Sequence, residues 1–193
     1  TGRYRRHAVV VAGPGLGKST MLRALAHRYA QDGYMVLSAP LPWIAAGINN
    51  GQAFTDRLLN KSFDGSGISA SDIIHDRRYS WVVLLDALDE CGQDQMTVAE
   101  DIRRFSLGHP NARIVVTTRP IGYTSNALID WKHYTLLAPE EGSDGVNNLL
   151  RAIAPEQNIP PLPKDLGDRN APSSGITISP QLMAMSAVLI QRG

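Results

Sequence analysis

The sequence is poor in cysteine, since Cys91 is the only one in 193 residues. A single thiol excludes an intramolecular disulfide and a metal site built from several thiolates. Structural disulfides are typical of oxidising compartments. The composition therefore predicts a reducing, cytoplasmic setting.

Long hydrophobic runs are also missing. The longest hold five residues, as in Ala8 to Ala12 and Trp81 to Leu85, against roughly 20 in a membrane-spanning helix. The first residues lack the apolar core of a signal peptide. We therefore expect no membrane segment. Because the chain opens at Thr1 without a methionine, we expect it to be a piece of a longer protein.

Neither sign of charge is in excess. Nineteen basic residues stand against eighteen acidic ones, which gives a formal charge of +1. A summed positive field is what draws a protein to nucleic acid or to an anionic membrane. The balance therefore gives no indication of direct nucleic-acid binding.

Short apolar segments alternate with amphipathic ones. Valine-rich runs bounded by glycine or polar residues are typical of strands buried on both faces of a parallel sheet. We expect strands over residues 8–12, 35–39, 81–85 and 113–117 and a weaker one over 134–137, with helices over 18–31, 51–61 and 95–107. This order predicts an α/β core over residues 1–138. A proline-rich and helical pattern over 139–193 predicts a partial, truncated helical domain.

A glycine-rich turn follows the first expected strand and opens the first helix. The segment AGPGLGKS matches the P-loop spacing, with alanine at its first position. Glycines let backbone N–H groups cradle phosphates, and the helix N-terminus favours the same anions. Lys18 is expected to reach the β- and γ-phosphates, and the Ser19 hydroxyl to bind Mg²⁺. The predicted nucleotide-binding residues of this segment are Gly13, Pro14, Gly15, Leu16, Gly17, Lys18, Ser19 and Thr20.

Three carboxylates follow the third expected strand in the run Asp86-Ala87-Leu88-Asp89-Glu90. Ligands of open α/β sheets bind at the carboxyl ends of the strands, and Mg²⁺ takes few protein oxygens. Asp86 is therefore the candidate partner of Ser19 at the metal. Asp89 and Glu90 are the candidates for orienting or deprotonating the attacking water, and the sequence leaves open which of them does so.

This acidic run, with a small residue after the first aspartate, resembles the NACHT family of the STAND class of P-loop NTPases. Ile114 to Pro120 (IVVTTRP) resembles the sensor strand of that family, and Pro180 to Met183 resembles a proline-led helix after its core. The resemblance implies a five-stranded parallel sheet in the ASCE order 5-1-4-3-2. It also implies that Arg119 contacts the γ-phosphate and that Pro180 lies against the adenine.

By the same resemblance, the chain is a switch that binds ATP or ADP with Mg²⁺ and hydrolyses ATP slowly, with Lys18, Asp89, Glu90 and Arg119 as the catalytic candidates. NACHT proteins self-associate when active, carry effector and sensor domains on the same full-length chain, and act in innate immunity or antiviral defence. Three alternatives remain: a nucleotide-binding scaffold with negligible hydrolysis, an AAA-type motor and a P-loop kinase. The small residue Ala87 counts against the motor, and the absence of an obvious lid with paired arginines counts against the kinase.

Overall fold

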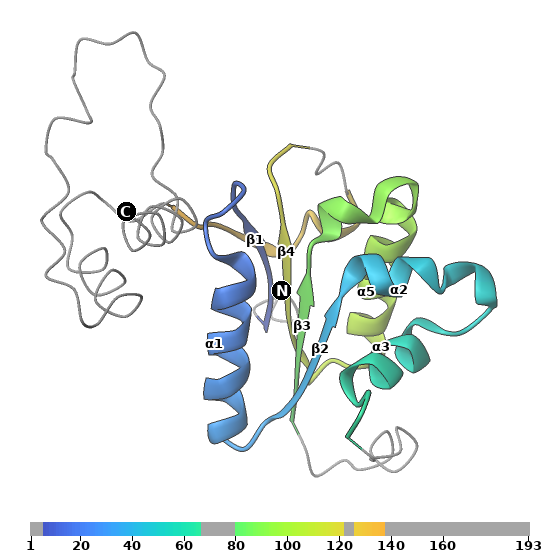
Figure 1. Ribbon diagram of the computed structural model, residues 1–193, viewed down its shortest axis with the longest axis horizontal. Coiled ribbons are helices and arrows are strands. Elements are labelled where there is room, and N and C mark those ends of the chain that lie inside the picture. Colours follow the sequence, from blue (N-terminus) through green and yellow to red (C-terminus); the bar gives the residue numbers. More distant parts are fainter. Residues whose placement is uncertain (1–5, 67–79, 122–125, 138–193) are drawn as a thin grey trace, which may run out of the picture. The chain divides into compact units, whose positions relative to one another are not determined.

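Five strands form one parallel sheet in the part of the chain that the computed structural model describes, residues 6–66, 80–121 and 126–137 (Figure 1). Their order is β2-β3-β4-β1-β5, and every neighbouring pair is parallel. The expected order 5-1-4-3-2 is thereby confirmed. The strands are β1 His7–Val11, β2 Met35–Pro40, β3 Trp81–Asp86, β4 Arg113–Thr118 and β5 Lys132–Thr135.

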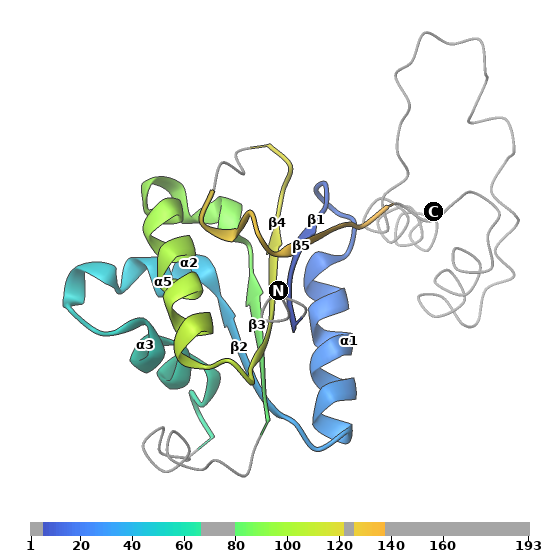
Figure 2. The same ribbon diagram turned by 180° about the vertical axis from the view of Figure 1, so that it is seen from behind.

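Helices cover both faces of the sheet (Figures 1 and 2). On β3, alternate side chains point to opposite faces, as the strand geometry requires. Val82 and Leu84 pack with α1, while Val83 and Leu85 join the larger core beneath α2, α3 and α5. The helices are α1 Lys18–Gln31, α2 Leu41–Ala46, α3 Phe54–Ser62 and α5 Gln95–Gly108, with short 3₁₀ segments η2 Ile48–Asn50, η3 Leu88–Asp94 and η4 Asn126–Leu128.

The strand register gathers the candidate site at one edge. Val11 of β1 lies opposite Thr118 of β4, and Leu85 of β3 lies opposite Val116. The ends of three adjacent strands therefore lead into the glycine-rich turn, the acidic run and Arg119. None of the described helices is long and apolar enough to cross a membrane.

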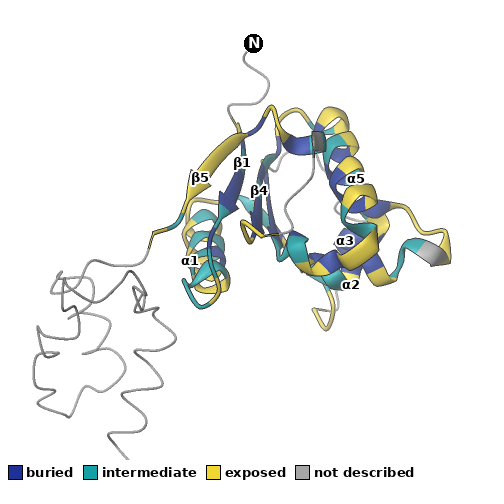
Figure 3. Ribbon diagram, turned by 90° about the horizontal axis from the view of Figure 1, so that it is seen from above, coloured by how far each residue is buried: buried dark blue, intermediate teal, exposed yellow. Residues whose placement is uncertain are grey.

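Two expected elements differ from the structure, and one helix of the structure was not expected. The last strand covers Lys132–Thr135 rather than 134–137, and all four of its residues are exposed (Figure 3). Because no side chain of β5 is buried, the apolar pattern that marks the other strands is missing there. The helix expected over 51–61 begins at Phe54, and α2 was not expected at all. The expected helical domain over 139–193 lies outside the described residues.

Candidate nucleotide site

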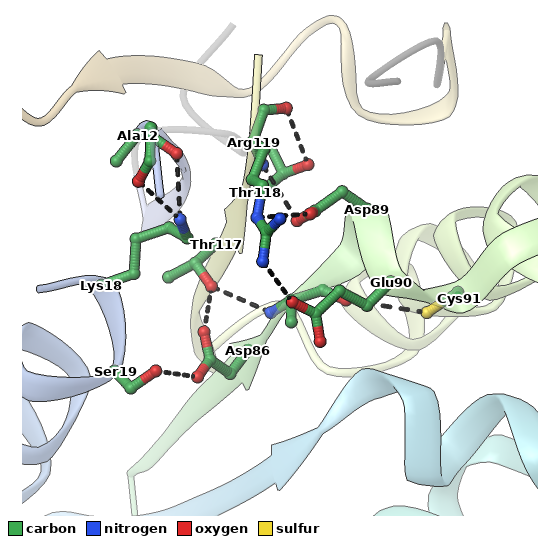
Figure 4. Close-up of polar contacts among 12 residues, drawn as sticks. Ala12, Lys18, Ser19, Asp86, Asp89, Glu90, Cys91, Thr117, Thr118 and Arg119 are labelled. Carbon is green, nitrogen blue, oxygen red and sulfur yellow. Dashed lines mark hydrogen bonds and ion pairs between the residues drawn. The ribbon is translucent and has the colours of Figure 1, made fainter. Parts of the chain in front are cut away.

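The glycine-rich turn connects β1 to α1, as predicted. Gly15 and Gly17 have φ values of 70° and 87°, a left-handed backbone that glycine adopts without steric cost. Lys18 folds back over the turn, and its Nζ donates to the carbonyl oxygens of Ala12 at 2.9 Å and Gly13 at 3.0 Å (Figure 4). The ammonium group thus lies at the start of the glycine-rich turn. It is the group expected to bind the phosphates of a nucleotide.

Asp86 ends β3 and holds two hydroxyl groups at once. The Ser19 Oγ donates to its Oδ2 at 2.6 Å, and the Thr117 Oγ1 donates to its Oδ1 (Figure 4). Ser19 and Asp86 are 67 residues apart in the sequence. The structure therefore brings together the two residues that the sequence assigned to the metal.

Ala87 turns the chain sharply after β3. Its φ of 64° and ψ of 56° lie in the left-handed region, and no other non-glycine residue of the described ranges has a positive φ. Bulky and β-branched side chains are strongly disfavoured in that conformation. This geometry gives a physical reason for a small residue at this place. The carbonyl oxygen of Ala87 then accepts the Glu90 N–H at 3.1 Å as η3 begins.

The turn directs Asp89 and Glu90 toward Arg119, which follows β4. The Arg119 backbone N–H donates to Asp89 Oδ1 at 2.9 Å, and its Nε lies 3.2 Å from Asp89 Oδ2. The Arg119 Nη2 donates to Glu90 Oε1 at 2.7 Å (Figure 4). The side chain of Asp89 is 7% exposed and that of Glu90 is 50% exposed. The two acids therefore differ in accessibility although they share one arginine.

Cys91 follows these acids and is buried. Removal from water, followed by the negative charges of Asp89, Asp94 and Glu90, raises the pKa of its thiol to about 12. Because the thiolate is the reactive form, this cysteine is suppressed as a nucleophile.

Thr117 is the residue that sequence reasoning missed. It is fully buried, and besides donating to Asp86 it accepts the Ala87 N–H at 3.0 Å. The available signal was a pair of threonines ending a valine-rich strand, because threonine in that place offers a hydroxyl where its neighbours offer only methyl groups. Of the remaining predicted residues, Thr20 is exposed near the start of α1, and Pro180 lies outside the described residues.

The donor set fits magnesium. Mg²⁺ prefers oxygen ligands at 2.0–2.1 Å in an octahedron, which places adjacent ligands about 2.9 Å apart. Ser19 Oγ and Asp86 Oδ2, 2.6 Å apart, are close to that separation. Because Ser19 uses its proton to reach Asp86, its oxygen lone pairs remain free for a metal. Asp86 can then act directly or through a bound water.

No model of a known protein family matches the chain, and no curated protein matches it significantly. Two solved structures, by contrast, have a similar fold. C. elegans PCH-2 is 16% identical with a TM-score of 0.62, and the match covers 97% of this chain and 55% of that one. A DNA replication initiation factor is 10% identical with a TM-score of 0.50, covering 77% of this chain and 43% of that one. The chain thus spans about half the length of these neighbours. At such low identity the matches show the fold alone, a parallel α/β sheet with helices on both faces.

Proposed function

We propose that this chain is a nucleotide-dependent switch that binds ATP with Mg²⁺ at the carboxyl edge of its sheet and hydrolyses it slowly. The observation that carries the proposal is the hydrogen bond of 2.6 Å from Ser19 to Asp86. It joins the first turn of α1, which follows the glycine-rich turn in the sequence, to the end of β3. A phosphate-binding turn and a magnesium carboxylate on neighbouring segments are the two parts that nucleotide hydrolysis by a P-loop protein requires.

When bound, Mg²⁺ supplies neutralisation of the charge that develops on the β- and γ-phosphates. The protein side of that chemistry falls to Lys18 and Ser19. Lys18 exchanges the two carbonyl oxygens that now hold it for phosphate oxygens, which are stronger partners because they are charged. Ser19 would hold the metal through its oxygen while its O–H continues to donate to Asp86.

Glu90 is the better candidate for the residue that orients or deprotonates water. Asp89 is almost buried and accepts both the backbone N–H and the Nε of Arg119, so its oxygens are committed to holding the strand end. Glu90 is half exposed, and Arg119 contacts one of its oxygens. A general base must reach the water from which it takes a proton, and Glu90 has that access.

The proposed switch is a change in the partners of Arg119. In the structure its guanidinium is paired with Asp89 and Glu90. A γ-phosphate offers a competing anion, so binding of ATP, but not of ADP, draws Arg119 away and releases Glu90. A ligand shifts a conformational equilibrium only as far as it binds the two states unequally, and the γ-phosphate is the group that differs.

The NACHT-like assignment rests on the small residue in the left-handed turn and on the arginine after the sensor strand. By that resemblance the switch controls self-association and acts together with effector and sensor domains on the full-length chain, in innate immunity or antiviral defence. A second candidate function is that of an AAA-type motor ATPase in place of a NACHT-like switch. It is favoured by the fold similarity to PCH-2, which extends over 97% of this chain.

Turnover and binding measured separately test the proposal. We expect Glu90→Gln to lower kcat for ATP by about 10²–10⁴-fold, the usual contribution of a general base, and to leave the affinity for ATP within a factor of about three. Glu100→Gln, at an exposed position of α5, is the matched control and should hydrolyse ATP like the wild type.

Two results would count against this function. Failure of the wild-type chain to bind ATP in the presence of Mg²⁺ would overturn it altogether. Tight binding with turnover at the background rate in the wild type would leave a nucleotide-binding scaffold. Sedimentation of the wild type with ATP and with ADP then examines self-association, which the switch predicts to be greater with ATP.

A further inference from the structure

We propose that Thr117 is a positioning residue that makes Asp86 a one-oxygen ligand and thereby sets a preference of the site for Mg²⁺ over Ca²⁺. This inference rests on the proposed function, since it concerns the metal that accompanies the nucleotide. It assigns a role to a residue whose hydroxyl contacts Asp86 and the backbone of Ala87. Its effect is transmitted through the carboxylate of Asp86.

The hydrogen-bond directions at Thr117 are fixed by its partners. The Ala87 backbone N–H can only donate, so the Thr117 oxygen accepts from it at 3.0 Å. The hydroxyl proton is then directed to Oδ1 of Asp86, which as a carboxylate can only accept. Thr117 is fully buried, and water therefore has no access to its hydroxyl. This hydrogen bond from Thr117 on β4 therefore fixes the rotation of the Asp86 carboxyl group on β3.

The second oxygen of Asp86 is the one that contacts the first turn of α1. Oδ2 accepts from Ser19 at 2.6 Å, so the metal side of Asp86 presents this oxygen while Thr117 holds Oδ1. Ca²⁺ takes six to eight oxygens and often binds both oxygens of one carboxylate, whereas Mg²⁺ requires six in a strict octahedron. A carboxylate restricted to one oxygen supports the smaller ion.

Thr118 provides a matched control on the same strand. It is also fully buried, but successive side chains of a strand point to opposite faces. Its hydroxyl donates to the carbonyl oxygen of Arg119 at 3.3 Å rather than to a carboxylate. Valine replaces threonine with nearly the same shape and removes the hydroxyl, so the two valine variants differ in the partner that loses its hydrogen bond.

The experiment uses the whole chain and a fluorescent, non-hydrolysable ATP analogue, titrated with Mg²⁺ or with Ca²⁺ after removal of metal by EDTA. Loss of a residue that orients a metal ligand commonly weakens metal affinity by about 10–100-fold. We expect Thr117→Val to raise the Mg²⁺ concentration for half-maximal binding about ten-fold and the Ca²⁺ value much less. Thr117→Ser should restore the wild-type preference, and Thr118→Val should retain it. Binding of the analogue in EDTA should be equal in all four proteins.

A double-mutant cycle examines the route of the effect. If Thr117 acts through Asp86, Thr117→Val adds nothing to the Mg²⁺ requirement once Asp86→Asn is present, because interacting residues are not additive. Circular dichroism establishes that each variant is folded. Thr117→Cys, whose thiol is a weak donor, replaces the valine variant if the latter does not fold.

The outcomes separate this inference from the proposed function. Equal wild-type binding of the analogue in EDTA and in Mg²⁺ would overturn both. A wild type that requires Mg²⁺, with Thr117→Val and Thr118→Val behaving alike, would overturn the role of Thr117 and leave the function standing. A Thr117→Val effect that persists undiminished in the Asp86→Asn protein would also overturn it.

Discussion

Two arginines of this chain are paired with carboxylates in different surroundings. Arg57 on α3 is 3% exposed and binds Asp101 of α5 at 3.1 Å and the carbonyl oxygen of Ile44. Arg119 at the strand end is 45% exposed and binds Asp89 and Glu90. A buried pair that loses one partner leaves an uncompensated charge, whereas an exposed pair contributes little to stability. The comparison indicates that the first arginine maintains the fold and the second is free to exchange partners.

The packing around Arg57 agrees with a structural role. A Cβ added at Gly47 would lie 2.9 Å from Arg57 Cδ, so the arginine stem fills the space above that glycine. Arg104 also approaches Asp101, at 3.6 Å, but its side chain is 78% exposed. Asp101 therefore has one buried and one exposed arginine, which provides a comparison within a single cluster.

The largest expected effect is on the buried pair. Arg57→Ala leaves Asp101 without its buried partner and the Ile44 carbonyl oxygen without a donor, and should lower the free energy of unfolding by about 3–5 kcal/mol. Urea denaturation measures this change. Arg104→Ala is the control and should change stability by less than about 0.5 kcal/mol. Equal effects of the two variants would remove the distinction between buried and exposed arginines.

An intermediate effect is expected at the turn that supplies Asp89 and Glu90 to Arg119. Left-handed backbone costs an ordinary residue about 1–2 kcal/mol, and a β-branched residue tolerates it worst. Ala87→Val should therefore be less stable than Ala87→Gly by about 2 kcal/mol in urea denaturation. A valine variant as stable as the glycine variant would show that the left-handed conformation is not required.

The smallest effect on stability is expected for the exposed pair. Arg119→Ala should lower the free energy of unfolding by at most about 1 kcal/mol, measured in the same way. Its consequence lies in ligand discrimination, because the ratio of ATP to ADP affinities should fall toward one when the γ-phosphate loses its arginine. A loss of stability comparable to that of Arg57→Ala would place Arg119 among the structural residues.

The sequence predicts most of the fold because local patterns determine it. The valine-rich runs indicated four strands to within a residue or two at each end, and α1 was predicted with its observed bounds. Helix α2 was missed because Pro40 and Pro42 resemble breakers. Pro42 lies in the first turn of that helix, where its missing N–H has no intrahelical partner to lose. Strand β5 was misplaced because its residues are exposed on both faces.

The residues of the candidate site also fall into two groups. Some belong to contiguous sequence motifs, and the role of others depends on contacts between segments far apart in the sequence. The glycine-rich turn and the acidic run are contiguous motifs, so their residues could be named from the sequence. The Thr117 contact depends on the register of β3 against β4, and the burial of Arg57 depends on the packing of α3 on α5. A single sequence contains no direct measure of either arrangement.

The strand order also has a consequence for how each chain folds during its synthesis. Strand β1 precedes the glycine-rich turn, yet its two neighbours in the sheet are β4 and β5, and His7 pairs with Ile114. During synthesis β1 therefore has no place in the sheet until the ribosome has released about a hundred further residues. Contacts of such long range slow folding. On the proposed function, nucleotide would bind only the assembled site, so it would stabilise the completed chain and none of its shorter precursors.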